Sequence, residues 1–265
     1  MAKPIITLDA GHGLKTSGKR CLKKLDPKET REWYLNDRIM DKVQEKLKSY
    51  DCTVLRVDDT TGAKDISLAN RVKQANNGKA DIYISMHHNA GLNGKSGGGT
   101  VVYYCSSKPA RRQQAERLYN AITYQTGLIG NRSEKVINKG FYVIKKTTMP
   151  AFLVENGFMD SPTDVPIILS ESHAEKTANG VVAFLVSELK LQEKKKTSVT
   201  SKKYFPKYDG EKTTLVNALS RIGVDNTYTY RKKIAKANGI SGYTGTSTQN
   251  VKIYNLLVAG MLLRP

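Results

Sequence analysis

The stretch Pro4-Ile5-Ile6-Thr7-Leu8-Asp9-Ala10-Gly11-His12-Gly13 joins an apolar run to a histidine that lies between two glycines. A short apolar run of this kind is typical of a buried strand, which we expect over residues 5–9. In open α/β sheets, ligands bind just beyond the carboxyl ends of the strands. His12 therefore lies where such a sheet places a functional side chain.

A second segment, Ala80-Asp81-Ile82-Tyr83-Ile84-Ser85-Met86-His87-His88-Asn89, has the same organisation. It predicts a strand over residues 81–87 that ends at a histidine. Two histidines at the ends of strands can converge on one metal ion, and catalytic zinc sites use three protein ligands and leave a fourth position open. The pattern favours metal-assisted hydrolysis, with His12 and His87 as ligands and a carboxylate as the third.

Carboxylates suited to such a site occur in two places. Glu32 precedes a predicted helix over residues 34–50, and negative charge is stabilised near a helix N-terminus; Glu29 lies close by and has the same chemistry. Glu155 follows the apolar run Pro150-Ala151-Phe152-Leu153-Val154, and a charge at the end of a buried strand needs a partner or a function. We expect Glu155 to act as general base and then as general acid.

The larger part of the chain alternates between strand and helix patterns, which predicts a layered α/β/α domain with a mostly parallel, twisted sheet. The expected strands are residues 5–9, 52–57, 81–87, 100–104, 141–144 and 151–155. The expected helices are residues 34–50, 68–76, 111–126 and 174–189.

The C-terminal part has a different character. Residues 192–203 are polar and without periodicity, which indicates a linker between a domain at 1–191 and a second domain at 204–265. The second domain is predicted to be small and mainly helical, with helices over residues 213–222, 228–237 and 248–260. In the last helix we expect one apolar side made of Val251, Tyr254, Leu257 and Val258. So small a domain needs a compact core or a partner, and self-association is one way to supply it.

The charge is high and unevenly distributed. The 265 residues carry 43 Lys and Arg against 24 Asp and Glu, a formal net charge of +19. Residues 192–265 alone contain 14 basic and 4 acidic side chains. This excess predicts a polyanionic partner, which can be nucleic acid, anionic lipid or a wall polymer; simple solubility is the alternative.

Three cysteines, Cys21, Cys52 and Cys105, form an odd set at irregular spacing, which predicts reduced thiols. The N-terminus lacks the apolar region of a signal peptide, and no apolar run is long enough to span a bilayer. We therefore expect synthesis as a soluble cytoplasmic chain without a signal peptide.

Five blocks together resemble the zinc-dependent N-acetylmuramoyl-L-alanine amidases of the amidase-3 family, over about residues 4–189. They occur in the family's order and at compatible spacing. The blocks are Leu8-Asp9-Ala10-Gly11-His12-Gly13, Glu32-Trp33-Tyr34-Leu35-Asn36, Leu68-Ala69-Asn70-Arg71-Val72 with Ala75-Asn76, residues 80–90, and Met149-Pro150-Ala151-Phe152-Leu153-Val154-Glu155-Asn156-Gly157-Phe158.

The resemblance implies that His12, Glu32 and His87 bind Zn²⁺ and that Glu155 is the catalytic carboxylate. It prefers Glu32 to Glu29, because the family's ligand precedes a Leu-Asn pair by the same offset. The implied reaction hydrolyses the amide between N-acetylmuramic acid and L-alanine of peptidoglycan. Arg71 and Asn89 are expected to support the ligand residues without binding the metal themselves.

Two features depart from the family's pattern. His88 stands where the family has a small residue, and we expect it to flank the site or point away. The lysine-rich segment over residues 14–31 replaces a glycine-containing loop and alters one wall of the cleft. His173 matches nothing in the family and lies in a polar stretch, so we expect it to be exposed to solvent.

The C-terminal domain resembles a short wall-binding domain of bacillus phage and prophage amidases. The matching stretches are residues 204–208, 222–225, 231–240 and 256–265. The resemblance implies an anionic or carbohydrate wall polymer as partner, and an endolysin that reaches the wall after membrane permeabilisation. The alternatives are a sporulation-related host autolysin of the same activity and a zinc endopeptidase that cuts the stem peptide. A nucleic-acid-binding protein is disfavoured because no recognised motif is present.

Overall fold

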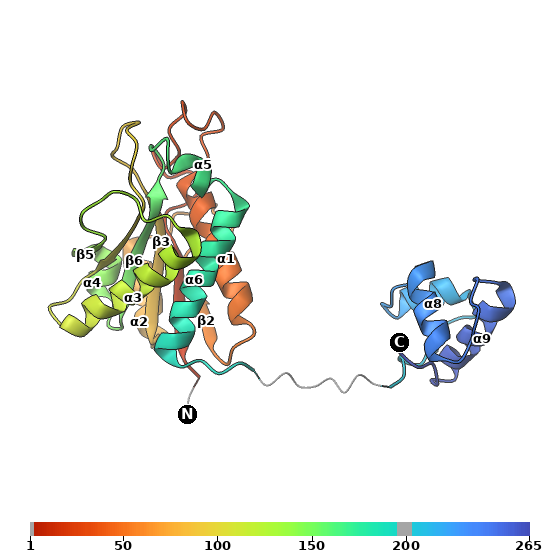
Figure 1. Cartoon of the computed structure of the whole chain (residues 1–265). Helices are drawn as coiled ribbons and strands as arrows, with labels where there is room; N and C mark the ends of the chain where they lie inside the picture. Colours follow the sequence, from red (N-terminus) through yellow and green to blue (C-terminus); the bar gives the residue numbers. More distant parts are fainter. Residues whose placement is uncertain (1–2, 195–202) are drawn as a thin grey trace. The chain divides into compact units, whose positions relative to one another are not determined.

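The computed structural model describes residues 3–194 and 203–265 (Figure 1). The chain divides into two compact units, Met1–Lys194 and Lys195–Pro265. Residues 195–202, the middle of the expected linker, lie outside the described residues. Among the residues that the structure describes, no helix is long and apolar enough to cross a membrane.

The first unit is built on a six-stranded sheet, as far as the chain is described, in the order β2-β1-β3-β6-β4-β5. Neighbouring strands are parallel except β4, which is antiparallel to β6. The prediction of a mostly parallel sheet is thus confirmed. The strands are β1 (Ile5–Ala10), β2 (Thr53–Arg56), β3 (Ile82–Asn89), β4 (Thr100–Tyr104), β5 (Val136–Asn138) and β6 (Ala151–Phe158).

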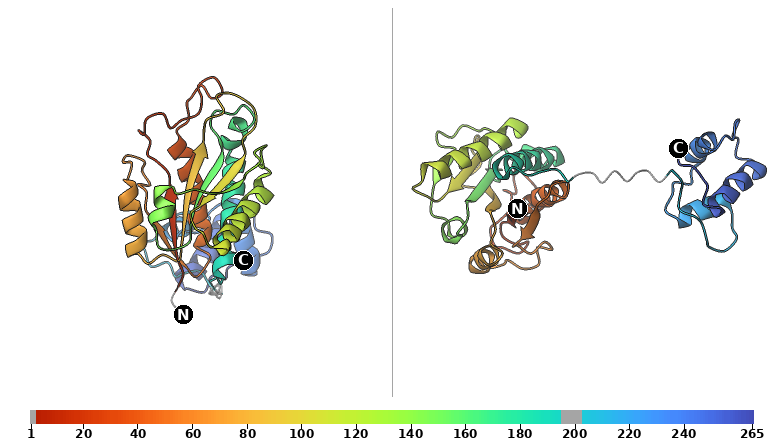
Figure 2. Two further views of the ribbon diagram at one scale, coloured as in Figure 1. Left: turned by 90° about the vertical axis from the view of Figure 1, so that its left-hand side faces the viewer. Right: turned by 90° about the horizontal axis from the view of Figure 1, so that it is seen from below.

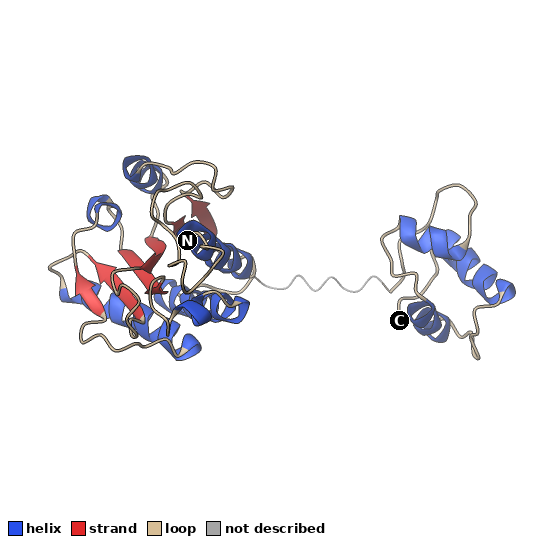
Figure 3. Cartoon of the chain, turned by 90° about the horizontal axis from the view of Figure 1, so that it is seen from above, coloured by secondary structure: helices blue, strands red, loops and turns tan. Residues whose placement is uncertain are grey.

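Helices cover both faces of the sheet (Figures 2 and 3). Those of the first unit are α1 (Glu32–Leu47), α2 (Leu68–Asn77), α3 (Pro109–Thr126), α4 (Tyr142–Lys146), α5 (Val165–Ile168) and α6 (Glu171–Leu189). Apolar residues of α1, α3 and α6 form one core with one face of the sheet. Residues of α2 and α4 form a second core on the opposite face. The result is the expected α/β/α layering.

The alternation of side chains along β1 explains why this strand lies inside the sheet, between β2 and β3. Ile6 and Leu8 are fully buried in the core under α1 and α6, and burying each contributes about 2 kcal/mol. Asp9, one position further on, faces the opposite layer and is also buried. A buried carboxylate needs partners, and those partners lie beneath the site described below.

One expected strand is wrong. Residues 141–144 do not form a strand: Phe141 precedes helix α4, and a short strand, β5, lies just before it at Val136–Asn138. Val143 and Ile144 are nevertheless buried, in the core between the sheet and α2. An apolar run of four residues does not distinguish a helical turn from a strand, because either can bury two of its side chains.

Strand β6 is longer than predicted and carries an irregularity. It continues past Glu155 to Phe158, so that Glu155 lies within the strand. His87 is in register with Glu155 and Asn89 with Phe158, which leaves one extra residue on β6. Such a bulge redirects the side chains beside it and is frequent next to functional sites.

The second unit is a small helical fold with its own core. Its helices are α7 (Leu215–Arg221), α8 (Tyr228–Ala237) and α9 (Ser247–Val258). A threonine precedes each of them, and its side chain accepts a hydrogen bond from a backbone N–H of the first turn. Ile234, Ile253 and Leu257 are fully buried in this core.

The predicted apolar side of the last helix is partly wrong. Leu257 is buried as expected, but Val251 and Val258 are 51% and 37% exposed. Ile253, which the prediction left out, is fully buried instead. The unit is too small to cover a wide stripe, so only the narrow side of α9 that faces the core is buried.

Candidate metal centre

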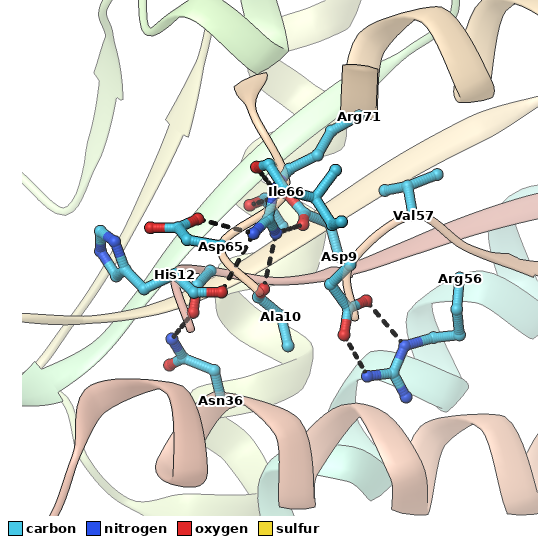
Figure 4. Close-up of polar contacts among 12 residues, drawn as sticks. Asp9, Ala10, His12, Asn36, Arg56, Val57, Asp65, Ile66 and Arg71 are labelled. Atoms are coloured by element: carbon cyan, nitrogen blue, oxygen red, sulfur yellow. Dashed lines mark hydrogen bonds and ion pairs between the residues drawn. The ribbon is translucent and has the colours of Figure 1, made fainter. Parts of the chain in front are cut away.

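The polypeptide turns sharply at His12, directly after β1. His12 has a φ of 68°, which is uncommon for a residue with a Cβ atom. Arg71 of α2 holds this turn: its Nη2 donates to the His12 carbonyl at 3.0 Å, and its Nη1 donates to the Ala10 carbonyl at 2.7 Å (Figure 4). Local strain of this type persists where the surrounding structure fixes it.

Arg71 is itself fixed from below by Asp9. The two side chains form a buried ion pair, and Asp9 Oδ2 also accepts hydrogen bonds of 2.7 Å from the hydroxyls of Tyr83 and Ser85. Burial raises the pKa of Asp9, but the charges of Arg71 and His87 and the hydrogen bonds from Ser85 and Tyr83 together outweigh it and leave the pKa below its usual value. The histidine thus stands on a rigid, fully hydrogen-bonded support.

His12, Glu32 and His87 converge at the carboxyl ends of β1 and β3. One candidate ligand atom from each lies within 4.8 Å of the other two. Glu32 Oε1 is 3.3 Å from His12 Nε2 and 3.0 Å from His87 Nδ1. Glu32 is the first residue of α1 and is almost completely buried. The three residues predicted as ligands therefore come together from three separate elements.

The alternative ligand Glu29 is not part of this cluster. Its carboxylate lies 3.1 Å from Nε of Arg20, and it belongs to the loop before α1. Among the described residues, the cluster of His12, Glu32 and His87 has the donor spacing of a metal site.

The donor set fits zinc. Two imidazole nitrogens and one carboxylate oxygen are typical ligands of a catalytic zinc ion. Glu32 Oε2 is buried and accepts no hydrogen bond from any described residue. Although burial raises the pKa of Glu32, the hydrogen bonds from His12 and His87 hold it well below the usual range. A buried anionic oxygen without a hydrogen-bond donor is costly. Nζ of Lys19, at 3.8 Å, is too far away to donate, and a metal cation bound beside the oxygen would remove that cost.

Glu155 borders the same cluster from β6. It is half-buried, and burial raises its pKa to about 7, while the nearby His87 charge acts in the opposite direction. Its Oε2 has no hydrogen-bond partner among the described residues. The carboxylate faces a cavity of 560 Å³ that His12 and His87 also line. Leu68 at the start of α2 and residues 141–143 also line this cavity.

His88 points away from this cavity, as predicted. Successive side chains of a strand lie on opposite faces, so His88 enters the core under α1. Its Nδ1 is 2.8 Å from Oδ1 of Asn36, and Nδ2 of Asn36 donates to the Gly11 carbonyl at 3.1 Å. Burial lowers the pKa of His88 to about 3, so the imidazole is neutral. Asn36 therefore connects the segment before His12 to the strand of His87.

The prediction that His173 is exposed to solvent is wrong. Only 3% of the residue is exposed, and its Nε2 lies 2.9 Å from Nδ2 of Asn156, the neighbour of Glu155. The polar sequence around it misled the prediction. Ser170 is the N-cap of α6, and of the polar residues 170–173 only His173 is on the buried side of the helix.

Sequence reasoning missed several residues of the site. Asn36 lies four positions after Glu32 on α1, a spacing that places both side chains on one face. Asp9 carried a signal too, since it is a charge within an apolar run. Nζ of Lys19, in the loop before α1, lies 3.8 Å from Glu32 Oε2, and nothing in the sequence indicated this. Asn89 Oδ1 accepts a hydrogen bond from the Ala90 backbone, and its supporting role stays a prediction.

Comparison with known proteins identifies the class to which this fold and site belong. Residues 6–187 match the amidase-3 family, described as N-acetylmuramoyl-L-alanine amidase. The chain is 29% identical over 263 residues to the endolysin of Bacillus phage SPP1, covering 95% of this chain and 92% of that protein.

Solved structures agree with this family. An N-acetylmuramoyl-L-alanine amidase of Clostridium difficile 630 has a TM-score of 0.64 at 26% identity, covering 72% of this chain and 98% of that one. The catalytic domain of CwlV, an amidase of Bacillus (Paenibacillus) polymyxa var. colistinus, has a TM-score of 0.60 at 28% identity, covering 71% of this chain and 99% of that one.

The fold and the His-Glu-His cluster thus define a zinc-dependent hydrolase of peptidoglycan. The chain belongs to the amidase-3 family of N-acetylmuramoyl-L-alanine amidases. The predictions of family, enzyme class and zinc dependence are confirmed.

Proposed function

We propose that His12, Glu32 and His87 hold the zinc ion of this amidase and that Glu155 is its catalytic carboxylate. The observation that supports this most directly is the convergence of the three ligand atoms within 4.8 Å, with Glu155 in register beside His87. Arg71 supports the ligand set through the His12 carbonyl, and Asn36 supports it through Gly11.

The reaction replaces an amide C–N bond with a C–O bond from water, and one proton of the water goes to the leaving nitrogen. A bound zinc ion supplies Lewis acidity to the carbonyl and the water. Glu155 takes the proton from the attacking water and delivers it to the nitrogen of L-alanine. Burial raises the pKa of Glu155 to about 7 in the metal-free protein, and a zinc ion bound nearby would lower it, which favours the ionised carboxylate that accepts the proton from water.

Product analysis tests this assignment. The zinc-loaded protein is expected to release new N-terminal alanine from purified Gram-positive peptidoglycan, without new reducing sugar ends. Glu155→Gln keeps the shape of the side chain but removes the proton acceptor, so the rate should fall by at least about a hundredfold. Glu29→Gln, a matched change in a carboxylate outside the cluster, should leave the rate within about twofold.

Other products would point to other functions. New amino groups on other residues of the stem peptide would indicate an endopeptidase. Full activity of Glu155→Gln would contradict the catalytic role, and zinc binding unaffected by His87→Ala would contradict the ligand set.

We also propose that residues 204–265 form a wall-binding domain, joined through the linker 192–203 to the catalytic domain at 1–191, and that its ligand is an anionic or carbohydrate wall polymer. The similarity to the phage SPP1 endolysin supports this, because it extends over nearly the whole chain. The excess of basic residues after Gln192 supports it as well.

The same similarity supports a role as a phage or prophage endolysin that is made in the bacterial cytoplasm and acts after membrane permeabilisation. Cells that express the chain should stay intact until the membrane is permeabilised chemically and then lyse, whereas cells expressing Glu155→Gln should not lyse. Lysis without permeabilisation, or only during sporulation, would instead favour a host autolysin.

A further inference from the structure

A groove in the second unit carries three positive charges on one side of helix α8. Lys232, Lys233 and Lys236 are all exposed and follow Thr229 at the three- and four-residue spacing that forms one helix stripe. Like charges at this spacing destabilise an isolated helix, so local folding does not explain them. None of the three makes an ion pair with any described residue of the chain.

The groove has a volume of 770 Å³, and its other wall is the loop over residues 239–244. No carboxylate is among the described residues that line it. The lining also contains the hydroxyl groups of Thr229, Ser241 and Thr244 and the aromatic ring of Tyr228, which is 47% exposed. The groove therefore combines cations, hydroxyls and one accessible ring.

The loop that closes the groove is held rigidly. The Tyr243 hydroxyl donates to Asn250 Oδ1 at 2.5 Å and accepts from Arg231 Nη1 at 2.9 Å. Gln249 Nε2 donates to the Gly242 carbonyl at 3.0 Å, and the Tyr228 hydroxyl donates to the Tyr243 carbonyl at 3.2 Å. A preformed site loses less conformational entropy when a ligand binds.

We propose that this groove binds a phosphodiester-linked polyol or sugar polymer of the wall, with phosphates at Lys232, Lys233 and Lys236 and the polyol against Tyr228 and the loop hydroxyls. The inference rests on the proposed wall-binding function and gives it a site. The enzyme's substrate is the wall itself, which makes a wall-bound polyanion the relevant ligand. Arg231, the arginine of α8, donates hydrogen bonds to Tyr243 and Asn250 and does not line the groove. The positive charges that line it are therefore those of the three lysines.

The test uses the full-length, zinc-loaded protein and compares two triple variants of equal charge change. The first changes Lys232, Lys233 and Lys236 to Gln. The second, the matched control, changes Lys207, Lys212 and Lys252, which lie in the same unit but do not line the groove. Affinity for purified Gram-positive walls is measured by co-sedimentation at several salt concentrations, with thermal unfolding to verify folding.

The groove variant should bind at least about tenfold more weakly and with a smaller salt dependence, whereas the control should change by less than about threefold. Walls stripped of phosphodiester polymer with hydrofluoric acid should bind the wild-type protein as weakly as the groove variant binds intact walls. Hydrolysis of a soluble peptidoglycan fragment should be the same in all three proteins.

Each contrary result has a separate meaning. Equal loss of affinity in both variants would contradict the groove as the binding site but would not contradict the wall-binding function. Absence of binding by the wild-type protein would contradict the wall-binding function itself. Unchanged binding to stripped walls would exclude the phosphodiester polymer. Complete displacement from walls by duplex DNA at equal phosphate concentration would overturn the proposal in favour of nucleic acid.

Discussion

At the scale of single residues, the site depends on a histidine in an unfavourable backbone conformation. His12 has a positive φ, and the guanidinium of Arg71 compensates by binding two carbonyls of the turn and the carboxylate of Asp9. A metal ligand must be held to within a fraction of an ångström to be useful. The ion pair below the turn therefore contributes to function through geometry, because Arg71 binds the backbone carbonyls that set the position of His12.

Arg71→Met should destabilise the first unit by about 3–5 kcal/mol, because it leaves Asp9 buried and unpaired. Asp9→Asn combined with Arg71→Met should recover part of that loss. Urea unfolding of the single and double variants measures both effects. If the double variant is less stable than Arg71→Met alone, the two residues are not coupled as an ion pair.

His173 makes stability depend on pH. Burial lowers its pKa to about 4 in the folded protein, against about 6.5 when unfolded, so the unfolded state binds more protons between these values. Its contribution is fully present above pH 6.5 and is lost as the pH falls toward 4, by up to about 3 kcal/mol. Unfolding free energies measured from pH 4 to 7.5 should show this slope.

His173→Gln provides the control for that measurement, since glutamine is neutral throughout the range and can still hydrogen-bond to Asn156. The slope of stability against pH should decrease in this variant. An unchanged slope would assign the acid sensitivity to other groups.

Which residues could be predicted follows from where their partners lie. His12, His87 and Glu155 each follow an apolar run, so the sequence marks them as functional groups at strand ends. The burial of His88 and His173 could not be predicted, because their partners, Asn36 and Asn156, lie 52 and 17 residues away. Side-chain chemistry alone did not distinguish Glu32 from Glu29. The fold does, because it places Glu32 in the cluster and Glu29 beside Arg20.

At the scale of elements, α3 and α6 pack closely against each other at Gly180. A Cβ atom at Gly180 of α6 would lie 2.6 Å from the Ala121 carbonyl oxygen and 2.6 Å from the Ile122 Cα atom of α3. Both contacts are with backbone and cannot relax by a side-chain rotation. The glycine lets α6 approach α3 closely enough to complete the core on that face of the sheet.

Gly180→Ala should therefore lower stability by about 1–3 kcal/mol, although alanine is the better helix former. Lys176→Ala, an exposed change on the same helix, should alter stability by less than about 0.5 kcal/mol. Thermal unfolding of the two variants gives the comparison. Stabilisation by Gly180→Ala would mean that the two helices separate at no cost.

Most strands and helices were predicted close to their observed bounds, including the short strands β2 and β4, whereas β5 and α4 were not. The sequence marks β1, β3, α1 and α6 because each buries a regular set of side chains. A strand was wrongly expected at residues 141–144, where the structure has helix α4, because the apolar run is short and either a strand or a helix can bury Val143 and Ile144. The tertiary position of α4, beside α2, determines its structure more than its local sequence does.

At the scale of the whole molecule, catalysis and attachment are assigned to two units with separate cores. The metal cluster and Glu155 lie entirely in the first unit, and the lysine groove lies entirely in the second. An enzyme whose substrate is insoluble gains rate when a second module keeps it on the surface, because the local concentration of the catalytic unit rises.

A fragment of residues 1–194 should accordingly hydrolyse a soluble peptidoglycan fragment at a rate within about twofold of the full chain, yet solubilise intact walls at least about tenfold more slowly. Adding residues 195–265 as a separate chain should not restore the rate, because the effect depends on the covalent connection. Release of N-terminal alanine measures the first rate, and loss of turbidity of a wall suspension measures the second. If the fragment loses activity on the soluble substrate as well, the second unit supports the fold or the site of the first. If the fragment clears walls as fast as the full chain, attachment does not limit the reaction, and the positive charge of the second unit must serve another purpose.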